Sequence, residues 1–441
     1  MSFPRYERYK DSGPTWFGKV PSHWDVLDGR RVFAQKRTAS LPDDPQLSAT
    51  QKYGVIPQTL FMELEQQKVV LALKGTDAFK HVEIDDFIIS LRSFQGGIEK
   101  SHYRGCVSTA YTVLRNTKNI DAKYWEYLLK SPPYIDALSS VTDGIREGRS
   151  ISYAQFGGLP LPFPSVCEQT AIARFLDYET AKIDALKEEQ LRLIELLKNK
   201  RQAVISHAVT KGLNPDVQMK DSRIDWVGDV PHHWTVVPVA YRYDVQLGKM
   251  LDTLKITGEN LRPYLRVVDV QWDSINVDDL PLMDFDEDAR CKFRLRAGDL
   301  LINEGGSYPG RTAIWSSDLE CYYQKALHRL RPRAADTDHP RYFFYLMFWA
   351  LHTGVFTAGG NEATIEHLPA EKLRRYRFAF PQYEEQSGIA EFLDEQTSRF
   401  NSLISAAQRA IDLFQERRSA LISAAVTGKI DVRKYTPKEA A

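Results

Sequence analysis

Arginine, lysine and amide side chains gather around two paired-glycine loops, and side chains of these types hydrogen-bond to the base edges and phosphates of nucleic acids. The loop at Gly96-Gly97 is surrounded by Arg92, Gln95, Lys100, His102 and Arg104. The loop at Gly305-Gly306 is surrounded by Asn303, Ser307, Tyr308 and Arg311. Glycines lack side chains, so the backbone of each loop could approach a phosphate closely. An ordinary hairpin turn with solvated polar residues explains each loop about as well, and both interpretations stay open.

A second group of cations lies in the segment RCKFRLR. There Arg290, Lys292, Arg294 and Arg296 alternate with Cys291, Phe293 and Leu295. Strict alternation predicts a strand whose one face carries a row of cations suited to phosphates. A solvated sheet face would look the same, and that interpretation is favoured. Weaker candidates for contact with nucleic acid are Arg146, Arg149 and Asn361.

Motifs for catalysis are missing from the chain. An adenine methyltransferase would carry an Asn-Pro-Pro-aromatic motif, but the nearest segment is Asn214-Pro215-Asp216-Val217. There is no Glu-x-Lys triplet of the kind that metal-dependent nucleases use, and no Gly-x-x-x-x-Gly-Lys-Ser/Thr phosphate loop. The ten histidines and four separated cysteines show no metal-ligand spacing. We therefore predict no catalytic residues, no metal site and no cofactor for this chain.

The elements that position these side chains are duplicated. The segment from Lys10 to Val26, here called head 1, returns 210 residues later as head 2, from Lys220 to Val236, with ten of seventeen positions identical. The shared pattern is WxGxxPxHW. Residues that read two different sequences should differ between the copies, so we interpret the repeated tryptophans and histidines as a common joint and as core residues.

A second block, 168–210, returns at an offset of 217 as 385–427, and both copies are predicted to be long helices. Steps of four and three residues place mostly apolar side chains on one seam, which predicts an antiparallel coiled coil. The seam residues are Ile172, Leu176, Ile183, Leu186, Leu193, Leu197 and Val204 in the first copy, and Ile389, Leu393, Phe400, Leu403, Phe414 and Leu421 in the second. The alternative is that each helix packs only on its own domain.

The segments between heads and long helices, here called the bodies, keep a common skeleton despite their divergence. Segment 85–97 matches segment 298–306, and segment 106–115 matches segment 321–331. We predict an α+β protein with a pseudo-two-fold repeat: two related globular domains, 1–167 and 214–384, joined by two long antiparallel helices, 168–213 and 385–441. The helices would act as a spacer between the bodies.

The composition fits a soluble cytoplasmic protein. Hydrophobic residues make up 43% of the 441 positions, which suffices for several cores. No stretch is long and apolar enough for a membrane span, and the N-terminal segment lacks the apolar core of a signal peptide. The formal net charge is zero, so attraction to phosphates must come from local patches or from partner subunits.

The order of these blocks resembles the specificity subunit of type I restriction-modification systems. The resemblance rests on WxGxxPxHW, then FPxxxEQxxIAxFLD, then a long helix ending in AVT, all repeated, and it covers essentially the whole chain. It implies two target recognition domains, each reading half of a split sequence in double-stranded DNA. It also implies two adenine methyltransferase subunits docked on the helices, restriction and translocase subunits as further partners, and a prokaryotic source. S-adenosylmethionine, ATP and magnesium would belong to those partners.

Two other functions stay open on the residues alone. The chain could be an enzyme, a nuclease or methyltransferase with unrecognised motifs. It could also be a structural coiled-coil adaptor that reads no sequence.

Overall fold

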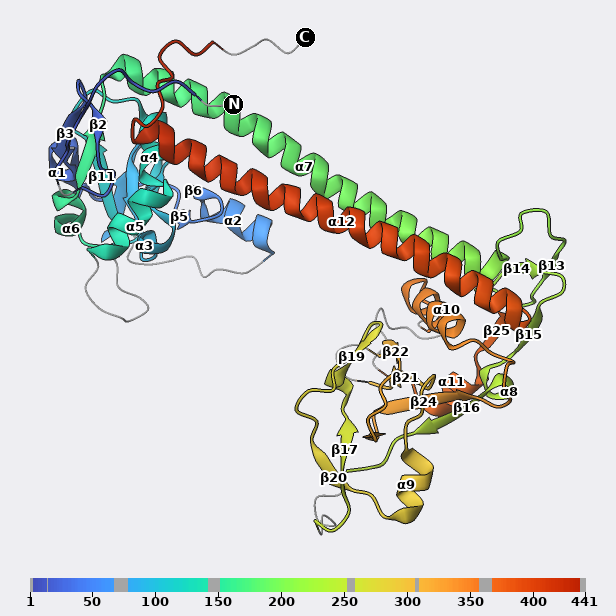
Figure 1. Ribbon diagram of the computed structural model, residues 1–441. Helices are drawn as coiled ribbons and strands as arrows, with labels where there is room; N and C mark the ends of the chain where they lie inside the picture. Colours follow the sequence, from blue (N-terminus) through green and yellow to red (C-terminus); the bar gives the residue numbers. More distant parts are fainter. Residues whose placement is uncertain are drawn as a thin grey trace. The chain divides into compact units, whose positions relative to one another are not determined.

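The computed structural model describes residues 3–13, 15–66, 78–141, 151–251, 258–305, 309–356 and 367–436. The chain divides into two compact units. Unit 1 comprises Met1–Leu191 and Arg409–Ala441, and unit 2 comprises Arg192–Gln408. Each unit contains one head, one body and a part of each of two long helices (Figure 1). The predicted α+β architecture is confirmed, with two β-rich domains and two long helices packed together.

A four-stranded antiparallel sheet lies in each body. Its strand order is β4-β11-β8-β9 in unit 1 and β16-β24-β21-β22 in unit 2. The strands are β4 (Phe33–Lys36), β8 (Phe87–Ile89), β9 (Glu99–Lys100) and β11 (Thr112–Asn116), and β16 (Tyr243–Leu247), β21 (Leu300–Asn303), β22 (Thr312–Ile314) and β24 (Leu327–Pro332). Strands β8 and β21 hold the same place in the two sheets, as do β11 and β24. The predicted common skeleton is therefore confirmed.

Each body returns to its head before the long helix begins. In head 1, β1 (Tyr9–Lys10) pairs with β2 (Val20–Pro21), and in head 2, β13 (Met219–Asp221) pairs with β14 (Asp229–Pro231). The next strands, β3 (Asp25–Asp28) and β15 (Thr235–Pro238), pair with β12 (Pro160–Phe163) and β25 (Arg377–Phe380). These ladders fix the start of each long helix against its own head.

The remaining elements surround the two sheets. In unit 1 they are α1 (Gly29–Val32), β5 (Leu47–Thr50), β6 (Gly54–Pro57), α2 (Gln58–Glu65), β7 (Lys80–Val82), α3 (Ser93–Gly96), β10 (Gly105–Val107), α4 (Ala122–Leu129), α5 (Pro132–Ser140) and α6 (Tyr153–Gly158). In unit 2 they are α8 (Val239–Arg242), β17 (Leu261–Leu265), η3 (Val267–Asp269), β18 (Val270–Gln271), β19 (Ser274–Ile275), β20 (Leu282–Asp284), α9 (Glu287–Phe293), β23 (Tyr322–Tyr323), α10 (Pro340–His352) and α11 (Ala370–Arg375).

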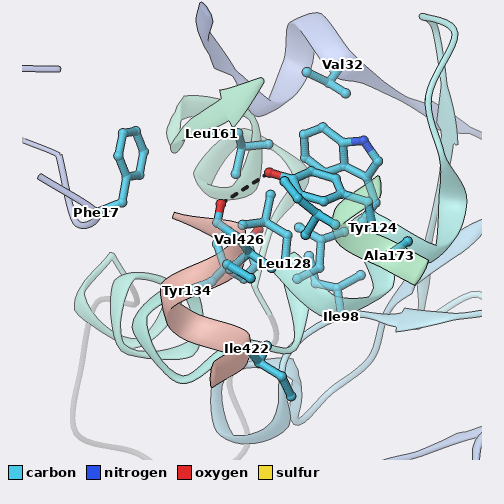
Figure 2. Packing of buried hydrophobic residues seen from close by; sticks show 14 of the residues in the cluster. Phe17, Val32, Ile98, Tyr124, Leu128, Tyr134, Leu161, Ala173, Ile422 and Val426 are labelled. Atoms are coloured by element: carbon cyan, nitrogen blue, oxygen red, sulfur yellow. Dashed lines mark hydrogen bonds between the residues drawn. The ribbon is translucent and has the colours of Figure 1, made fainter. Parts of the chain in front are cut away.

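The core of unit 1 joins the body to the end of a long helix. Tyr124 and Leu128 of α4 pack there with Ile422 and Val426 (Figure 2). The Tyr124 hydroxyl donates a hydrogen bond to the Val426 carbonyl at 3.2 Å. Unit 2 repeats this bond, because the hydroxyl of Tyr342 on α10 donates to the carbonyl of Val209 at 3.3 Å.

The long helices are α7 (Val166–Lys211), of 46 residues, and α12 (Tyr383–Val426), of 44 residues. At 1.5 Å per residue they extend about 69 and 66 Å. Both begin two residues before the predicted starts at 168 and 385. Unit 1 contains the start of α7 and the end of α12, and unit 2 contains the end of α7 and the start of α12. This arrangement agrees with the predicted antiparallel pairing.

The seam between the helices differs from the prediction at its centre. Of the predicted residues, Ile172, Leu176, Ile183, Ile389, Leu393, Phe400 and Leu421 are buried, and Leu197, Val204 and Phe414 are half-buried. Leu186, Leu193 and Leu403, however, are exposed to 49%, 42% and 54%. Placing these three leucines in the seam was wrong.

The buried residues repeat every eleven positions rather than every seven. They are Ile172, Ile183, Ile194 and Ile205 on α7, and Ile389, Phe400, Ile411 and Ile422 on α12. Eleven residues in three turns give about 3.67 residues per turn, close to the natural 3.6. After Ile183, a strict heptad count reaches each seam position one residue too early. It therefore selects Leu186 and Leu193, which lie outside the buried seam.

The predicted strand at 290–296 is also wrong. Residues Glu287–Phe293 form helix α9, and Arg294 follows as its C-cap. The Asp286 carboxylate accepts a hydrogen bond from the Ala289 amide at 2.8 Å and so caps the helix. Glu287 and Asp288 lie in the first turn, where the helix dipole favours negative charge. Local capping outweighs the alternation of polar and apolar residues.

Candidate nucleic-acid interface

The first turn of each long helix carries a glutamate whose carboxylate contacts the histidine of a head. The Glu168 carboxylate lies 3.0 Å from His23 Nε2, and the Glu385 carboxylate lies 2.7 Å from His233 Nε2. Glu168 is 4% exposed, whereas the histidines remain about half exposed. The repeated histidines therefore have a structural partner in both units.

The next residue of each helix ties the body to the same joint. Gln169 is fully buried. Its side-chain oxygen Oε1 accepts hydrogen bonds from the Asp121 backbone amide at 2.9 Å and from Trp125 Nε1 at 3.1 Å. Its counterpart Gln386 accepts from the His339 amide at 2.9 Å, directly before α10. The Glu-Gln pair thus connects head, body and helix.

The end of the other long helix completes each joint. Gly428, with φ of +73°, packs so closely on head 1 that a Cβ atom would lie 2.4 Å from Pro21. Gly212, with φ of +75°, also faces its head, but less closely, because a Cβ atom there would lie 3.4 Å from Trp234 of head 2. Trp24 and Trp234 are both fully buried. The interpretation of the heads as a common joint agrees with these contacts.

One hydrogen bond distinguishes the two joints. Trp234 Nε1 donates to Glu385 Oε1 at 3.1 Å. In unit 1 the Tyr6 hydroxyl donates to Glu168 Oε1 at 2.6 Å instead, and Trp24 Nε1 is a buried donor without a partner within the described residues. The joints share their framework but differ in the hydrogen bonding of the tryptophan indole N–H group.

The central sheets are held by a second repeated pair. Arg115 on β11 donates two hydrogen bonds to Asp86, at 2.7 and 2.6 Å. Arg331 on β24 donates two to Asp299, also at 2.7 and 2.6 Å. These hydrogen bonds raise the pKa of both guanidinium groups. Both aspartates directly precede the strand that runs into the glycine loop, so the pairs anchor that strand.

Gly97 and Gly305, one glycine of each pair, pack closely against their own domains. At Gly97, which has φ of +82°, a Cβ atom would lie 2.3 Å from the carbonyl oxygen of Leu129. At Gly305, a Cβ atom would lie 2.5 Å from His367 Nδ1. Each loop is therefore pressed against its own domain at these positions, and the expected close backbone approach to a ligand does not fit this packing.

Two of the predicted interface residues are buried. Lys100 lies 3.2 Å from Asp85 and 3.5 Å from Glu126, and only 8% of its side chain is exposed. Asn303 is 1% exposed and donates to the Val267 carbonyl at 3.4 Å. Neither side chain can reach a nucleic acid in this conformation, so both predictions are corrected.

The remaining candidates of unit 1 lie on its surface. Arg92 and Gln95 are exposed at the short helix α3, and Arg104 is exposed with its guanidinium 3.8 Å from Asp44. His102 lies 3.6 Å from Glu126. These side chains remain available for hydrogen bonds to bases or phosphates.

The candidates of unit 2 separate into two places. Arg311 is half-buried and donates to the side-chain oxygen of Gln271. Lys292 and Arg294 are exposed at the end of α9, and Arg290 is partly buried on that helix.

Five candidates from the two units lie outside the described residues: Arg146, Arg149, Ser307, Tyr308 and Asn361.

The sequence prediction missed an exposed apolar surface on the long helices. Leu186 and Leu413 are exposed in unit 1, and their counterparts Leu403 and Leu196 are exposed in unit 2. Exposure of these leucines ranges from 49% to 62%. A count of eleven-residue periods would have placed them outside the seam.

The described part of the chain shows no cluster of metal ligands. There, no group of three or more His, Cys, Asp or Glu side chains could hold a metal ion. Among the same residues, no helix is long and apolar enough to cross a membrane.

The chain is similar to known specificity subunits. It is 30% identical over 148 residues to the type I restriction enzyme StySPI specificity subunit of Salmonella potsdam, a match that covers 32% of each chain. It is 20% identical to the putative type I restriction enzyme MjaX specificity subunit of Methanocaldococcus jannaschii, over 98% of this chain and 99% of that protein. No protein-family model matches.

Solved structures share the fold. The HsdS subunit from Thermoanaerobacter tengcongensis superposes with a TM-score of 0.57 at 15% identity, covering 94% of this chain and 99% of that one. A chain from a study of complex assembly and conformational transition of the type I R-M system gives 0.69 at 14% identity, covering 92% and 98%. Over its full length the chain is therefore similar to type I restriction enzyme specificity subunits, and it shares the fold of these solved structures.

Proposed function

We propose that this chain, as the non-catalytic specificity component of a type I restriction-modification enzyme, reads a bipartite sequence in double-stranded DNA. One body would read each half. The observation that carries the proposal is the division between shared and diverged residues. The joints built by Glu168 and Glu385 share the glutamate–histidine contact in both units, whereas the exposed cations of the bodies differ.

The candidate contacts for one half of the target are Arg92, Gln95 and Arg104. For the other half they are Lys292, Arg294 and Arg311. Arginine suits this role because its fork can donate two hydrogen bonds to a guanine in the major groove.

We further propose that the helix pair docks two copies of one partner, the modification subunit. The exposed leucines support this, because Leu186 with Leu413 and Leu403 with Leu196 form matching apolar pairs in the two units. Identical partners need matching surfaces. S-adenosylmethionine, ATP and magnesium would be bound by the modification and restriction subunits.

Exchange of one body tests the recognition proposal. A chimera that carries another body between Trp24 and Pro164, purified with its modification subunits, should methylate DNA with one half-site changed and the other retained. The parent complex and a chimera in unit 2 are the matched controls. An active chimera with both half-sites altered would contradict independent reading by the two bodies.

The same preparation separates the alternatives. Methyl transfer or cleavage by the chain alone, with magnesium and S-adenosylmethionine, would favour an enzyme. A complex that protects no specific DNA sequence would favour a structural adaptor.

A further inference from the structure

A cavity of about 470 Å³ opens in unit 2 beside head 2. It lies where the turn of the head meets the end of α11 and the start of β25. The side chains used below are Arg223, Trp226, Lys372, Arg375, Tyr376 and Arg377. We call it the Trp226 cavity.

The Trp226 cavity is strongly cationic. Arg223, Lys372, Arg375 and Arg377 line it and are all exposed, and Asp225 is the one acidic side chain of its lining. Within the described residues none of the four cations forms an ion pair, although Arg377 donates to the Val236 carbonyl at 3.2 Å. Four positive charges on one cavity wall attract an anion, and arginine and lysine are the usual ligands of phosphate.

An aromatic surface adjoins these charges. Trp226 is 38% exposed, and its ring lies 6.2 Å from that of Tyr376 at an angle of 69°. An exposed indole offers a face for stacking against a planar ring such as a nucleic-acid base.

At the equivalent place in unit 1, the described residues lack these cations: Gln155, Gly158 and Pro160 stand where unit 2 has Lys372, Arg375 and Arg377. Trp16 corresponds to Trp226, but its Nε1 donates to the Pro160 carbonyl at 2.8 Å and its ring packs on Tyr134. The β3–β12 and β15–β25 ladders match Pro160 to Arg377. The short helix before each of these strands also ends differently. Helix α6 ends at Gly158, whereas α11 ends at Arg375.

This difference separates the cavity from the common framework. A residue needed only for the joint would be kept in both units, as Glu168 and Glu385 are. Three of the four cations, Lys372, Arg375 and Arg377, lie in the segment EKLRRYR, and unit 1 has AQFGGLP there.

We propose that the Trp226 cavity binds a nucleotide. Lys372, Arg375 and Arg377 contact its phosphate, and its base lies against Trp226. The same chemistry has two sources: a free mononucleotide, or one nucleotide within a nucleic acid. Both carry a phosphate next to a planar ring.

The test titrates the full-length chain with defined probes. Calorimetry with AMP, adenosine and inorganic phosphate measures binding of a free nucleotide. Anisotropy of a labelled single-stranded oligonucleotide of random sequence, at several salt concentrations, measures binding within nucleic acid, because the bases of a single strand are free to stack. The variants are the double substitution Lys372→Gln with Arg375→Gln, and Trp226→Ala. A charge-matched control replaces exposed Arg409 and Arg417 on α12 by Gln.

Either source gives a distinct result. For a free nucleotide, AMP binds more tightly than adenosine or phosphate, and each cavity variant weakens AMP roughly tenfold or more while the control does not. For a nucleotide of nucleic acid, AMP binds no more tightly than phosphate, but the cavity variants weaken binding of the single strand and lower its salt dependence more than the control does.

The proposal is overturned if the folded cavity variants, checked by their melting temperature, bind AMP and the single-stranded oligonucleotide as the control does. It is also overturned if Trp226→Ala leaves both affinities unchanged, because an anion alone would then explain the cations.

Discussion

Arg201 on α7 donates a hydrogen bond to the side-chain oxygen of Asn401 on α12 at 2.6 Å. The counterpart of this contact in unit 1 is an ion pair, in which Arg418 Nε lies 3.1 Å from Asp184. Both arginines and both partners are related by the 217-residue offset of the repeat. Unit 1 has a carboxylate at the position where unit 2 has an amide, and burial lowers the pKa of Arg201 from its ordinary value.

Replacing Asn401 by Asp should restore the missing ion pair. The half-buried guanidinium then gains an opposite charge at hydrogen-bond distance, which for partly exposed pairs contributes about 0.2–1 kcal/mol to the free energy of unfolding. Urea unfolding measures the change.

The matched control is Asp184→Asn in unit 1, which should lose a similar amount. Both effects should shrink at high salt, because ions screen the attraction. An Asn401→Asp variant no more stable than the parent at low salt would show that the Arg201 charge gains nothing from a carboxylate partner.

Gln169 and Gln386 offer a test of the joints. Replacing either by Leu leaves buried partners unsatisfied, among them the Asp121 amide in unit 1 and the His339 amide in unit 2. Each variant should be destabilised by about 2–4 kcal/mol, since an unsatisfied buried group costs roughly 1–3 kcal/mol. The same substitution at exposed Gln415 is the control. Equal stability of Gln169→Leu and Gln415→Leu would refute the role of the joint.

Much of the fold could be predicted from the sequence because the two halves of the chain can be aligned with each other. Head, sheet and helix segments that recur at fixed offsets indicate which parts build a common framework. The match of segment 85–97 with 298–306 located the equivalent strands β8 and β21 even though few residues are identical. Long helices without internal proline were equally clear.

The errors arose where two patterns compete. Heptad and eleven-residue periods agree from Ile172 to Ile183 and then diverge by one residue. From Leu186 on, the heptad count therefore predicts seam residues that are exposed. Alternation in RCKFRLR predicted a strand, but the cap at Asp286 favours a helix. Candidate contacts such as Lys100 failed because a sequence does not reveal that Asp85 and Glu126 surround the ammonium group. The cations of EKLRRYR were missed because only the fold brings them to Trp226.

His81 should make the stability of the chain depend on pH. Burial of its imidazole opposes protonation, but hydrogen bonds with Glu83 and Asp44, at 2.9 and 2.6 Å, outweigh it and raise the pKa of His81. The folded protein therefore holds this proton at a pH where the unfolded chain, with an ordinary value of about 6.5, has lost it. The stabilisation is complete below that value and is lost as pH rises through the raised pKa.

A comparison with His81→Gln isolates this effect. The advantage of the parent in free energy of unfolding should be larger at about pH 6 than at about pH 8. An advantage that grows with pH would show that His81 is neutral in the folded protein.

Glutamate at Leu186 or Leu403 should weaken partner docking without unfolding the chain. Both side chains are exposed, so the change costs little stability, but a charge in an apolar contact opposes binding. Each single variant should bind one modification subunit instead of two, and the double variant should bind none. Native mass spectrometry measures the stoichiometry. Glutamate at the exposed residue Ala185 serves as the control. Retention of two partners by the double variant would contradict the proposal.

The final prediction concerns the long helices as a spacer. Arg192 and Arg409 are equivalent residues at the boundary between the two units. Inserting four helix-forming residues at each adds about 6 Å to the helix pair. At about 3.4 Å per base pair this corresponds to one to two base pairs. The half-sites should stay the same while the gap between them lengthens by that amount, as methylation mapping of the complex would reveal.

An insertion of eleven residues at the same two places separates folding from geometry. It preserves the eleven-residue seam, so the chain should fold with unchanged helicity, but it adds about 16 Å, or about five base pairs. Five base pairs are half a turn of DNA, and the two bodies would then need to read opposite faces of the duplex. We expect a folded but inactive complex. If the four-residue insertion gave an active complex with an unchanged gap, the helices would not set the spacing.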